Sequence, residues 1–193
     1  MMTLASAAAF APVARVARFS APVKMSFESE IGAQPPLGFW DPLGLLTDAD
    51  QDRFDRLRYV ETKHGRIAQL AILGHLVTTA GYRLPTSLTP GYDLSSTPTG
   101  LAALSALPSE AIFGTLLTVA VIEGGFLARQ DDIEEAQLKA SGWDAETIDK
   151  KKSIELNNGR AAQMGILALM VHEKLDNNPY IINSLLGSPV AFN

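Results

Sequence analysis

The sequence has no cysteine, little charge and no long basic run among its 193 residues. Disulfides, thiolate metal sites and cysteine nucleophiles are therefore excluded. Charged residues make up 19% of the chain and apolar residues 47%, which excludes an intrinsically disordered protein. The net charge is −5 and the only basic tract is 150–152, so nucleic acid is not an expected partner. The length fits one domain.

The sequence also lacks an uninterrupted run of 20 apolar residues, so hydropathy alone does not identify a membrane protein. Three shorter apolar stretches are present, and only the middle one carries a formal charge, Glu123. Together with their helical extensions, these stretches predict transmembrane helices at about 53–82, 109–129 and 153–174. Glycine and proline mark the connection after the first helix as an irregular loop, and short amphipathic segments flank the helices.

Lysine and arginine are unevenly distributed between the connections of these helices. If each helix crosses a membrane once, nine of them lie on one side and two on the other. The nine are Arg53, Arg56, Arg58, Lys63, Arg129, Lys139, Lys150, Lys151 and Lys152. An excess of this kind on one side is typical of proteins that cross the membrane. The sequence therefore predicts an all-α membrane protein with three transmembrane helices.

The N-terminal residues have the composition of a targeting segment. They contain arginine, lysine and serine but no acid before Glu28, which is typical of a transit peptide. The alternative is an N-terminus without any such role. We expect residues 1–25 to be a targeting sequence that is removed, and residues 26–193 to form a single domain.

An internal repeat contains the most informative polar residues. Residues 61–74 read ETKHGRIAQLAILG and residues 155–168 read ELNNGRAAQMGILA, with seven of fourteen positions identical. Two related helices in one short chain predict a pseudo-twofold pair. Gly65 and Gly159 occupy the same position in each copy, and glycine allows two helices to approach closely. The first and third helices are therefore expected to cross.

The charges of the repeat predict how the two helices pair. In each copy the glutamate and the arginine are five residues apart, about 140° around a helix, so they cannot pair well within it. A charge at membrane depth costs ~2.5 kcal/mol or more and needs a partner. We therefore expect Glu61 to pair with Arg160, and Glu155 with Arg66. One interpretation is that these pairs only lock the helices together.

That interpretation leaves the histidines unexplained. His64, His75 and His172 all lie in the apolar stretches or at their ends, where each needs its own hydrogen-bond partner. Asn158 occupies the position of His64 in the second copy. Donors spread along several helices favour many separate cofactors, each with one axial ligand. A magnesium held by four ring nitrogens accepts carboxylate, amide or imidazole as such a ligand.

The repeat and two further segments resemble those of a known protein family. The doubled E-x-x-[HN]-G-R motif resembles the first and third helices of the light-harvesting chlorophyll-binding proteins, over residues 38–192. The segments FWDPLGL at 39–45 and RFDRLRYVE at 53–61 are most similar to the fucoxanthin chlorophyll a/c proteins of diatoms and related algae. The junction before Phe10 resembles the bipartite plastid targeting sequence of the same algae.

The resemblance implies a pigment-binding antenna without bond-making chemistry. Its implied cofactors are chlorophyll a, chlorophyll c and fucoxanthin, with diadinoxanthin as a further candidate. Its implied place is the thylakoid membrane of the plastid, as a multi-pass protein in contact with thylakoid lipids. Its implied partners are other antenna subunits and a photosystem core, in an oligomer or supercomplex.

The resemblance also assigns roles to individual residues. Arg66 and Arg160 resemble the cross-pairing arginines. In plant relatives an arginine follows the glutamate of the middle helix by three residues; here that position is Phe126, so Glu123 lacks a local partner. The residues implied as axial ligands to chlorophyll magnesium are Glu61, His64, Glu123, Glu155, Asn158 and His172.

Four further residues are candidates for pigment contacts. His75 is expected to be another ligand. Gln69 and Gln163 recur in both copies and could ligate through their amides; the alternative is a hydrogen bond across the helix pair. Trp40 is expected near a carotenoid end group, with surface anchoring as the alternative.

Three other functions compete with light harvesting. A photoprotective member of the same family would dissipate excitation as heat, and the acids predicted on the less basic side are too few to decide. A di-iron helical bundle could use Glu61-x-x-His64, but the second copy has Asn158 and places an arginine beside each metal. A transporter is disfavoured because three unbroken helices form no inverted repeat pair.

Overall fold

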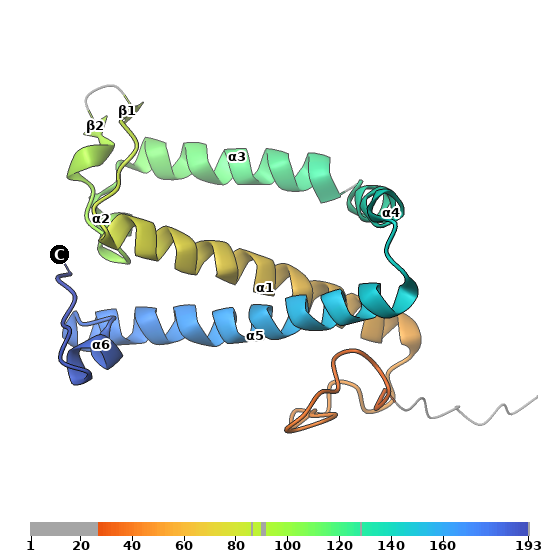
Figure 1. Ribbon diagram of the computed structural model, residues 1–193. Helices are drawn as coiled ribbons and strands as arrows, with labels where there is room; N and C mark the ends of the chain where they lie inside the picture. The colour runs from red at the N-terminus through yellow and green to blue at the C-terminus, as the bar shows by residue number, and fades with distance from the viewer. Residues whose placement is uncertain (1–26, 86, 90–91, 128, 193) are drawn as a thin grey trace, which may run out of the picture.

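Three long helices dominate the fold in the computed structural model (Figure 1). They are α1 (Gln51–Thr79), α3 (Ser109–Leu127) and α5 (Ala145–Asp176). The structure describes residues 27–85, 87–89, 92–127 and 129–192. The predicted targeting sequence, residues 1–25, lies outside the described residues.

Short elements connect or extend the long helices. They are the strands β1 (Ser87–Thr89) and β2 (Tyr92–Asp93), the 3-10 helix η1 (Leu94–Ser96), and the helices α2 (Ala102–Ala106), α4 (Gln130–Ser141) and α6 (Ile181–Leu185). The two strands pair antiparallel, so the prediction of an all-α fold is wrong in this loop. The short helix α6 lies where an amphipathic segment is expected. The protein is mostly helical.

The ends of α1 follow from its flanking residues. Asp50 caps the first turn, since its carboxylate accepts from the backbone N–H of Arg53 at 3.0 Å. The helix ends at Thr79, three residues before the predicted end, and Gly81 follows with φ +85°. Arg83 Nη1 donates to the carbonyl of Thr78 at 2.5 Å, which satisfies a carbonyl left free at the helix end.

Helix α5 begins earlier than the predicted start near residue 153. Gly142, with φ +64°, ends α4 in the left-handed conformation, and Asp144 then starts α5. The Thr147 hydroxyl donates to Asp144 Oδ1 at 2.6 Å and lowers the pKa of that carboxyl. A charged aspartate at a helix N-terminus is favourable. The lysine-rich stretch 150–152 therefore belongs to α5 and not to a separate surface segment.

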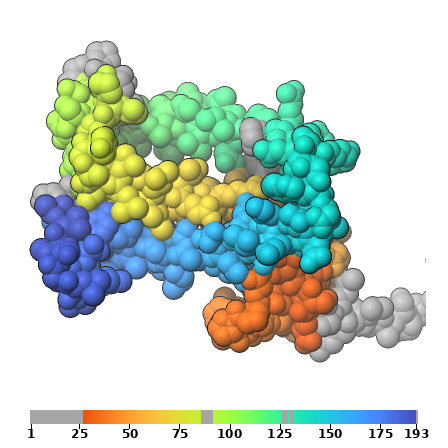
Figure 2. All heavy atoms as spheres, in the orientation of Figure 1, coloured from red at the N-terminus to blue at the C-terminus, as the bar shows by residue number. Residues whose placement is uncertain are grey.

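Two of the three long helices pack together and the third lies apart. Helices α1 and α5 pack against each other, whereas the backbone of α3 is separated from both (Figure 1). Helix α4 lies across the end where α3 finishes and α5 begins. Figure 2 shows an opening between the atoms of α3 and those of α1 in the same orientation.

Large apolar side chains cover the outside of these helices. Leu70 on α1, Phe113 on α3 and Met164 on α5 are each 68% exposed. Among the described residues no large side chain is fully buried, so the chain alone encloses almost no core. An exposed apolar surface of this extent is typical of contact with lipid or with another partner.

The sequence predicts three transmembrane helices, which correspond to α1, α3 and α5. Within the described residues, no helix combines the length and the apolarity needed to cross a membrane.

Candidate functional site: the crossing of α1 and α5

Helices α1 and α5 cross at two glycines. A Cβ atom placed on Gly65 would lie 2.8 Å from the Cα atom of Gly159, closer than such atoms approach. Both glycines are buried, and so are Ala68 and Ala162 one turn further along. Small residues therefore bring the two backbones into contact, and the close approach predicted from the repeat is confirmed.

Two ion pairs join the helices at this crossing. Arg66 Nε donates to Glu155 Oε1 at 2.5 Å, and Arg160 Nε donates to Glu61 Oε1 at 2.7 Å. Each charge is neutralised by the other helix and not by its own, as the five-residue spacing predicts. The four side chains are 34% to 42% exposed, so the carboxylates are neutralised without being enclosed.

Both glutamates retain an oxygen for a further ligand. Within the part of the chain that the structure describes, Oε2 of Glu61 and Oε2 of Glu155 make no hydrogen bond. Near them, His64 is exposed and its Nδ1 lies 2.7 Å from the carbonyl of Val60. A carbonyl only accepts, so Nδ1 carries the proton, and in the neutral ring Nε2 is the nitrogen with the lone pair. Asn158, the matching residue of α5, is also exposed.

Glu123 on α3 has a partner that the sequence analysis missed. Lys63 of α1 forms an ion pair with Glu123 Oε2. Only a cation on the same helix as Glu123 was expected as its partner. Lys63 gave no separate indication, because it is one of the many basic residues at this end of α1.

His75 is enclosed between α1, α5 and the C-terminal segment. Its Nδ1 lies 2.7 Å from the hydroxyl of Tyr180, which donates to Thr79 Oγ1 at 3.1 Å, and its Nε2 lies 3.9 Å from Glu173 Oε2. The side chain is only 6% exposed, so neither ring nitrogen is open to a pigment in this arrangement. A ligand role for His75 stays a prediction that this geometry does not favour. His172 is partly exposed.

The remaining predicted contacts are placed as follows. Gln163 Nε2 donates to the carbonyl of Glu61 at 3.2 Å, which is the hydrogen bond across the helix pair that was the alternative to a ligand role. Gln69 is partly exposed, and Trp40 is 68% exposed. Pigment contacts of these three residues stay predictions.

Comparison with known proteins identifies the family. The profile of the family described as "Chlorophyll A-B binding protein" matches residues 27–174, which include α1, α3 and all but the last two residues of α5. This chain belongs to that family.

Individual relatives in the chlorophyll-binding family are very similar along almost their whole length. Fucoxanthin-chlorophyll a-c binding protein D of Macrocystis pyrifera is 59% identical, over 89% of this chain and 100% of the relative. Protein F of the same organism is 57% identical, over 92% of this chain and 89% of the relative. Protein F of Phaeodactylum tricornutum is 52% identical, over 89% of this chain and 92% of the relative.

The donors at the crossing fit the magnesium of a chlorophyll. Magnesium is a hard ion that takes carboxylate and amide oxygens and accepts imidazole. Glu61 and Glu155 each offer one oxygen of a neutralised carboxylate, and His64 offers Nε2. A di-iron centre instead needs several converging acids and histidines. No group of three or more such side chains gathers among the described residues.

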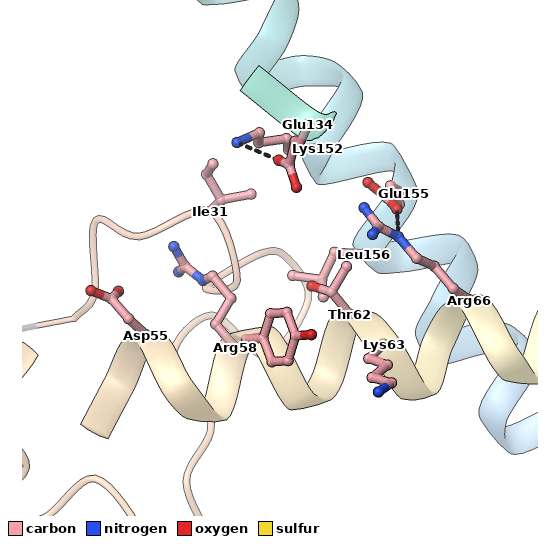
Figure 3. A pocket seen from close by; sticks show the side chains of 11 residues that line it. Ile31, Asp55, Arg58, Thr62, Lys63, Arg66, Glu134, Lys152, Glu155 and Leu156 are labelled. Atoms are coloured by element: carbon pink, nitrogen blue, oxygen red, sulfur yellow. Dashed lines mark hydrogen bonds and ion pairs between the residues drawn. The ribbon is translucent and has the colours of Figure 1, made fainter. Parts of the chain in front are cut away.

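A charged cavity of about 280 Å³ opens beside the Arg66–Glu155 pair (Figure 3). Arg58 and Lys152 line it as well, and Lys152 Nζ forms an ion pair with Glu134 Oε1 of α4 at 3.2 Å. The Lys152 contact ties α4 to the start of α5. Both cations were predicted on the more basic side, but their partners were not predicted.

An N-terminal segment, residues 27–34, covers the crossing at its basic end. The ring of Phe27 stacks on that of Phe54 with centroids 4.2 Å apart. Arg160 Nη1 donates to the carbonyl of Gly32 at 2.9 Å. The arginine that neutralises Glu61 of α1 therefore also binds this segment. The contact was not predicted, because nothing in the repeat indicates where the preceding chain lies.

Proposed function

We propose that this chain is a light-harvesting antenna protein that holds chlorophyll a, chlorophyll c and fucoxanthin and passes excitation energy to a photosystem. The observation that carries the proposal is the α1–α5 crossing, where two neutralised carboxylates each keep one oxygen free. The bound pigments absorb light and transfer the excitation, and the protein supplies axial ligands, spacing and orientation. We assign no bond-making reaction to the chain.

The residues of the crossing divide this work between them. Arg160 and Arg66 pair with the two carboxylates and fix their Oε1 atoms, so that Oε2 can bind magnesium. The carbonyl of Val60 fixes the tautomer of His64, so that Nε2 can do the same. The residues proposed as axial ligands are Glu61, His64, Glu123, Glu155, Asn158 and His172.

We further propose that α1, α3 and α5 cross the thylakoid membrane as one pigment-binding domain of residues 26–193. Two observations support the proposal that the helices cross a membrane. Large apolar side chains are exposed on all three helices, and one crossing by each helix would place nine lysines and arginines on one side against two on the other. Residues 1–25 would then direct the chain to the plastid and be removed.

The surroundings of the protein follow from the same proposal. The exposed apolar faces would contact thylakoid lipids, neighbouring antenna subunits and a photosystem core. Diadinoxanthin is a further candidate pigment, and Trp40 is a candidate contact for a carotenoid end group. Nucleic acid has no part in this function.

Reconstitution with pigments tests the proposal. We expect the full chain, refolded in detergent with chlorophyll a, chlorophyll c and fucoxanthin, to bind all three. Light absorbed by chlorophyll c or fucoxanthin should then appear as chlorophyll a fluorescence, because the protein holds the pigments close together. The same pigments in detergent without protein are the control. A chain that stays colourless, or one whose chlorophyll a emission is no greater than that control, would contradict the proposal.

A further inference from the structure

Glu123 lies in an apolar environment on a helix that is separated from the crossed pair. Its neighbours on α3, Val121 and Ile122, are apolar and more than half exposed. The positions one helical turn before and after it are Val119, Ala120, Phe126 and Leu127, none of which carries a charge. Helical neighbours three or four residues away are the ones that can pair on a helix surface. Helix α3 therefore cannot neutralise its own glutamate.

The neutralising charge comes from another helix. Lys63 Nζ of α1 bonds Oε2 of Glu123, bridging two helices whose backbones are otherwise separated. Lys63 lies between the proposed ligands Glu61 and His64 in the sequence, and its side chain points away from the Arg66–Glu155 pair (Figure 3). The four-carbon stem of lysine can span such a gap, which suits a contact between helices that do not touch.

The chemistry of lysine leaves part of the carboxylate available. An ammonium group is a compact point charge, and here it bonds one oxygen of the carboxylate. Here only Oε2 of Glu123 is bound, and Oε1 has no hydrogen bond within the described residues. The arrangement repeats that of Glu61 and Glu155, where one oxygen is bound by a cation and the other is free.

We propose that Lys63 is the positioning residue of a chlorophyll site at Glu123. Its ammonium group pairs with the carboxylate from across the gap between α1 and α3 and holds it in orientation, while Oε1 binds magnesium. The inference rests on the proposed function and adds to it a cation supplied by the neighbouring helix. The competing interpretation is that the ion pair only holds α3 in place.

Substitution of Lys63 separates the two interpretations. In Lys63→Met the stem is retained and the charge is lost, so we expect about one fewer chlorophyll per chain than in the wild type, since one axial site is disabled. Glu123→Leu should lose the same pigment, and the double variant no more than either single variant. Lys63→Arg retains the charge and should keep the pigment. Chlorophyll is measured by extraction against protein, and the affected site by visible circular dichroism.

A rescue variant provides the decisive control. In Lys63→Met combined with Phe126→Arg, the new arginine lies three residues beyond Glu123 on the same helix and can neutralise it locally. We expect this variant to regain the missing chlorophyll and its dichroism band, although the link between α1 and α3 is still broken. A purely structural ion pair would not be rescued in this way.

The outcomes keep the two proposals distinguishable. If the wild type itself binds no pigment, the proposed function fails. If the wild type is pigmented and Lys63→Met keeps every chlorophyll, only the role of Lys63 is wrong. The same holds if Lys63→Met loses pigments only in proportion to its helix content in far-ultraviolet circular dichroism. If Lys63→Met does not fold and Phe126→Arg restores folding without the pigment, the role of Lys63 is also contradicted.

Discussion

Replacement of Gly65 by leucine is expected to abolish assembly of the pigmented protein. A Cβ atom at this position would lie 2.8 Å from the Cα atom of Gly159, so even the first added carbon requires the two backbones to separate. Overpacking of this kind costs about 3 kcal/mol or more when the neighbour is backbone and cannot move aside. Separation would also break the Arg66–Glu155 and Arg160–Glu61 pairs. The yield of pigmented complex after reconstitution measures the effect.

Gly74 provides a matched control on the same helix. A Cβ atom at Gly74 would meet no atom within 4 Å, and leucine favours a helix over glycine equally at both positions. Gly74→Leu is therefore expected to assemble like the wild type. If Gly65→Leu assembles equally well, or if both variants fail alike, the crossing does not depend on the contact between the two glycines.

Replacement of Arg160 by leucine is expected to have the second largest effect. It leaves the carboxylate of Glu61 without a cation and removes the hydrogen bond to the carbonyl of Gly32. A polar group left without its partner costs about 1–3 kcal/mol and a charged group costs more, above all where lipid surrounds it. We expect a lower melting temperature of the pigmented protein and loss of the chlorophyll held by Glu61. Thermal loss of visible circular dichroism and pigment extraction measure the two effects.

A second substitution separates stability from pigment binding. In the double variant Glu61→Leu and Arg160→Leu no unpaired charge remains, so much of the stability should return. The chlorophyll should not return, because its ligand is gone. Arg160→Lys keeps the charge and should retain both. Recovery of the chlorophyll in the double variant would show that Glu61 is not its ligand.

The crossing could be predicted because its information is local and doubled. The repeat places Glu61, Arg66, Glu155 and Arg160 at the same register, and helical geometry forbids pairing within either copy. Neutralisation then requires the other helix, and glycine at the matching positions allows the contact. Each step depends on spacing along the chain, which the sequence states directly.

Contacts between elements without such a repeat could not be predicted. The Lys63–Glu123 pair depends on the distance and rotation between α1 and α3, which no periodicity of either helix determines. The enclosure of His75 likewise depends on where Tyr180 lies after the turn that follows α5. A ligand role was therefore predicted for His75, although its apolar neighbours in the sequence are equally consistent with a buried side chain.

Helix ends were predicted with mixed success for a similar reason. Helix α5 begins at Ala145 because Gly142 and Asp144 supply a stop and a start close together. The apolar stretch that guided the sequence analysis begins later, since charged residues extend a helix without adding to its apolar pattern. The strands β1 and β2 lie in a loop with few apolar residues, where alternation gives no indication of a hairpin.

The central claim is that each neutralised glutamate of the crossing binds a chlorophyll through its free oxygen. Cryo-electron microscopy of the chain isolated with its pigments tests this most directly. The account predicts a chlorophyll magnesium about 2.1 Å from Oε2 of Glu61 and another at the same distance from Oε2 of Glu155, with Arg160 and Arg66 still on the Oε1 atoms. A map in which neither carboxylate contacts a tetrapyrrole would contradict it.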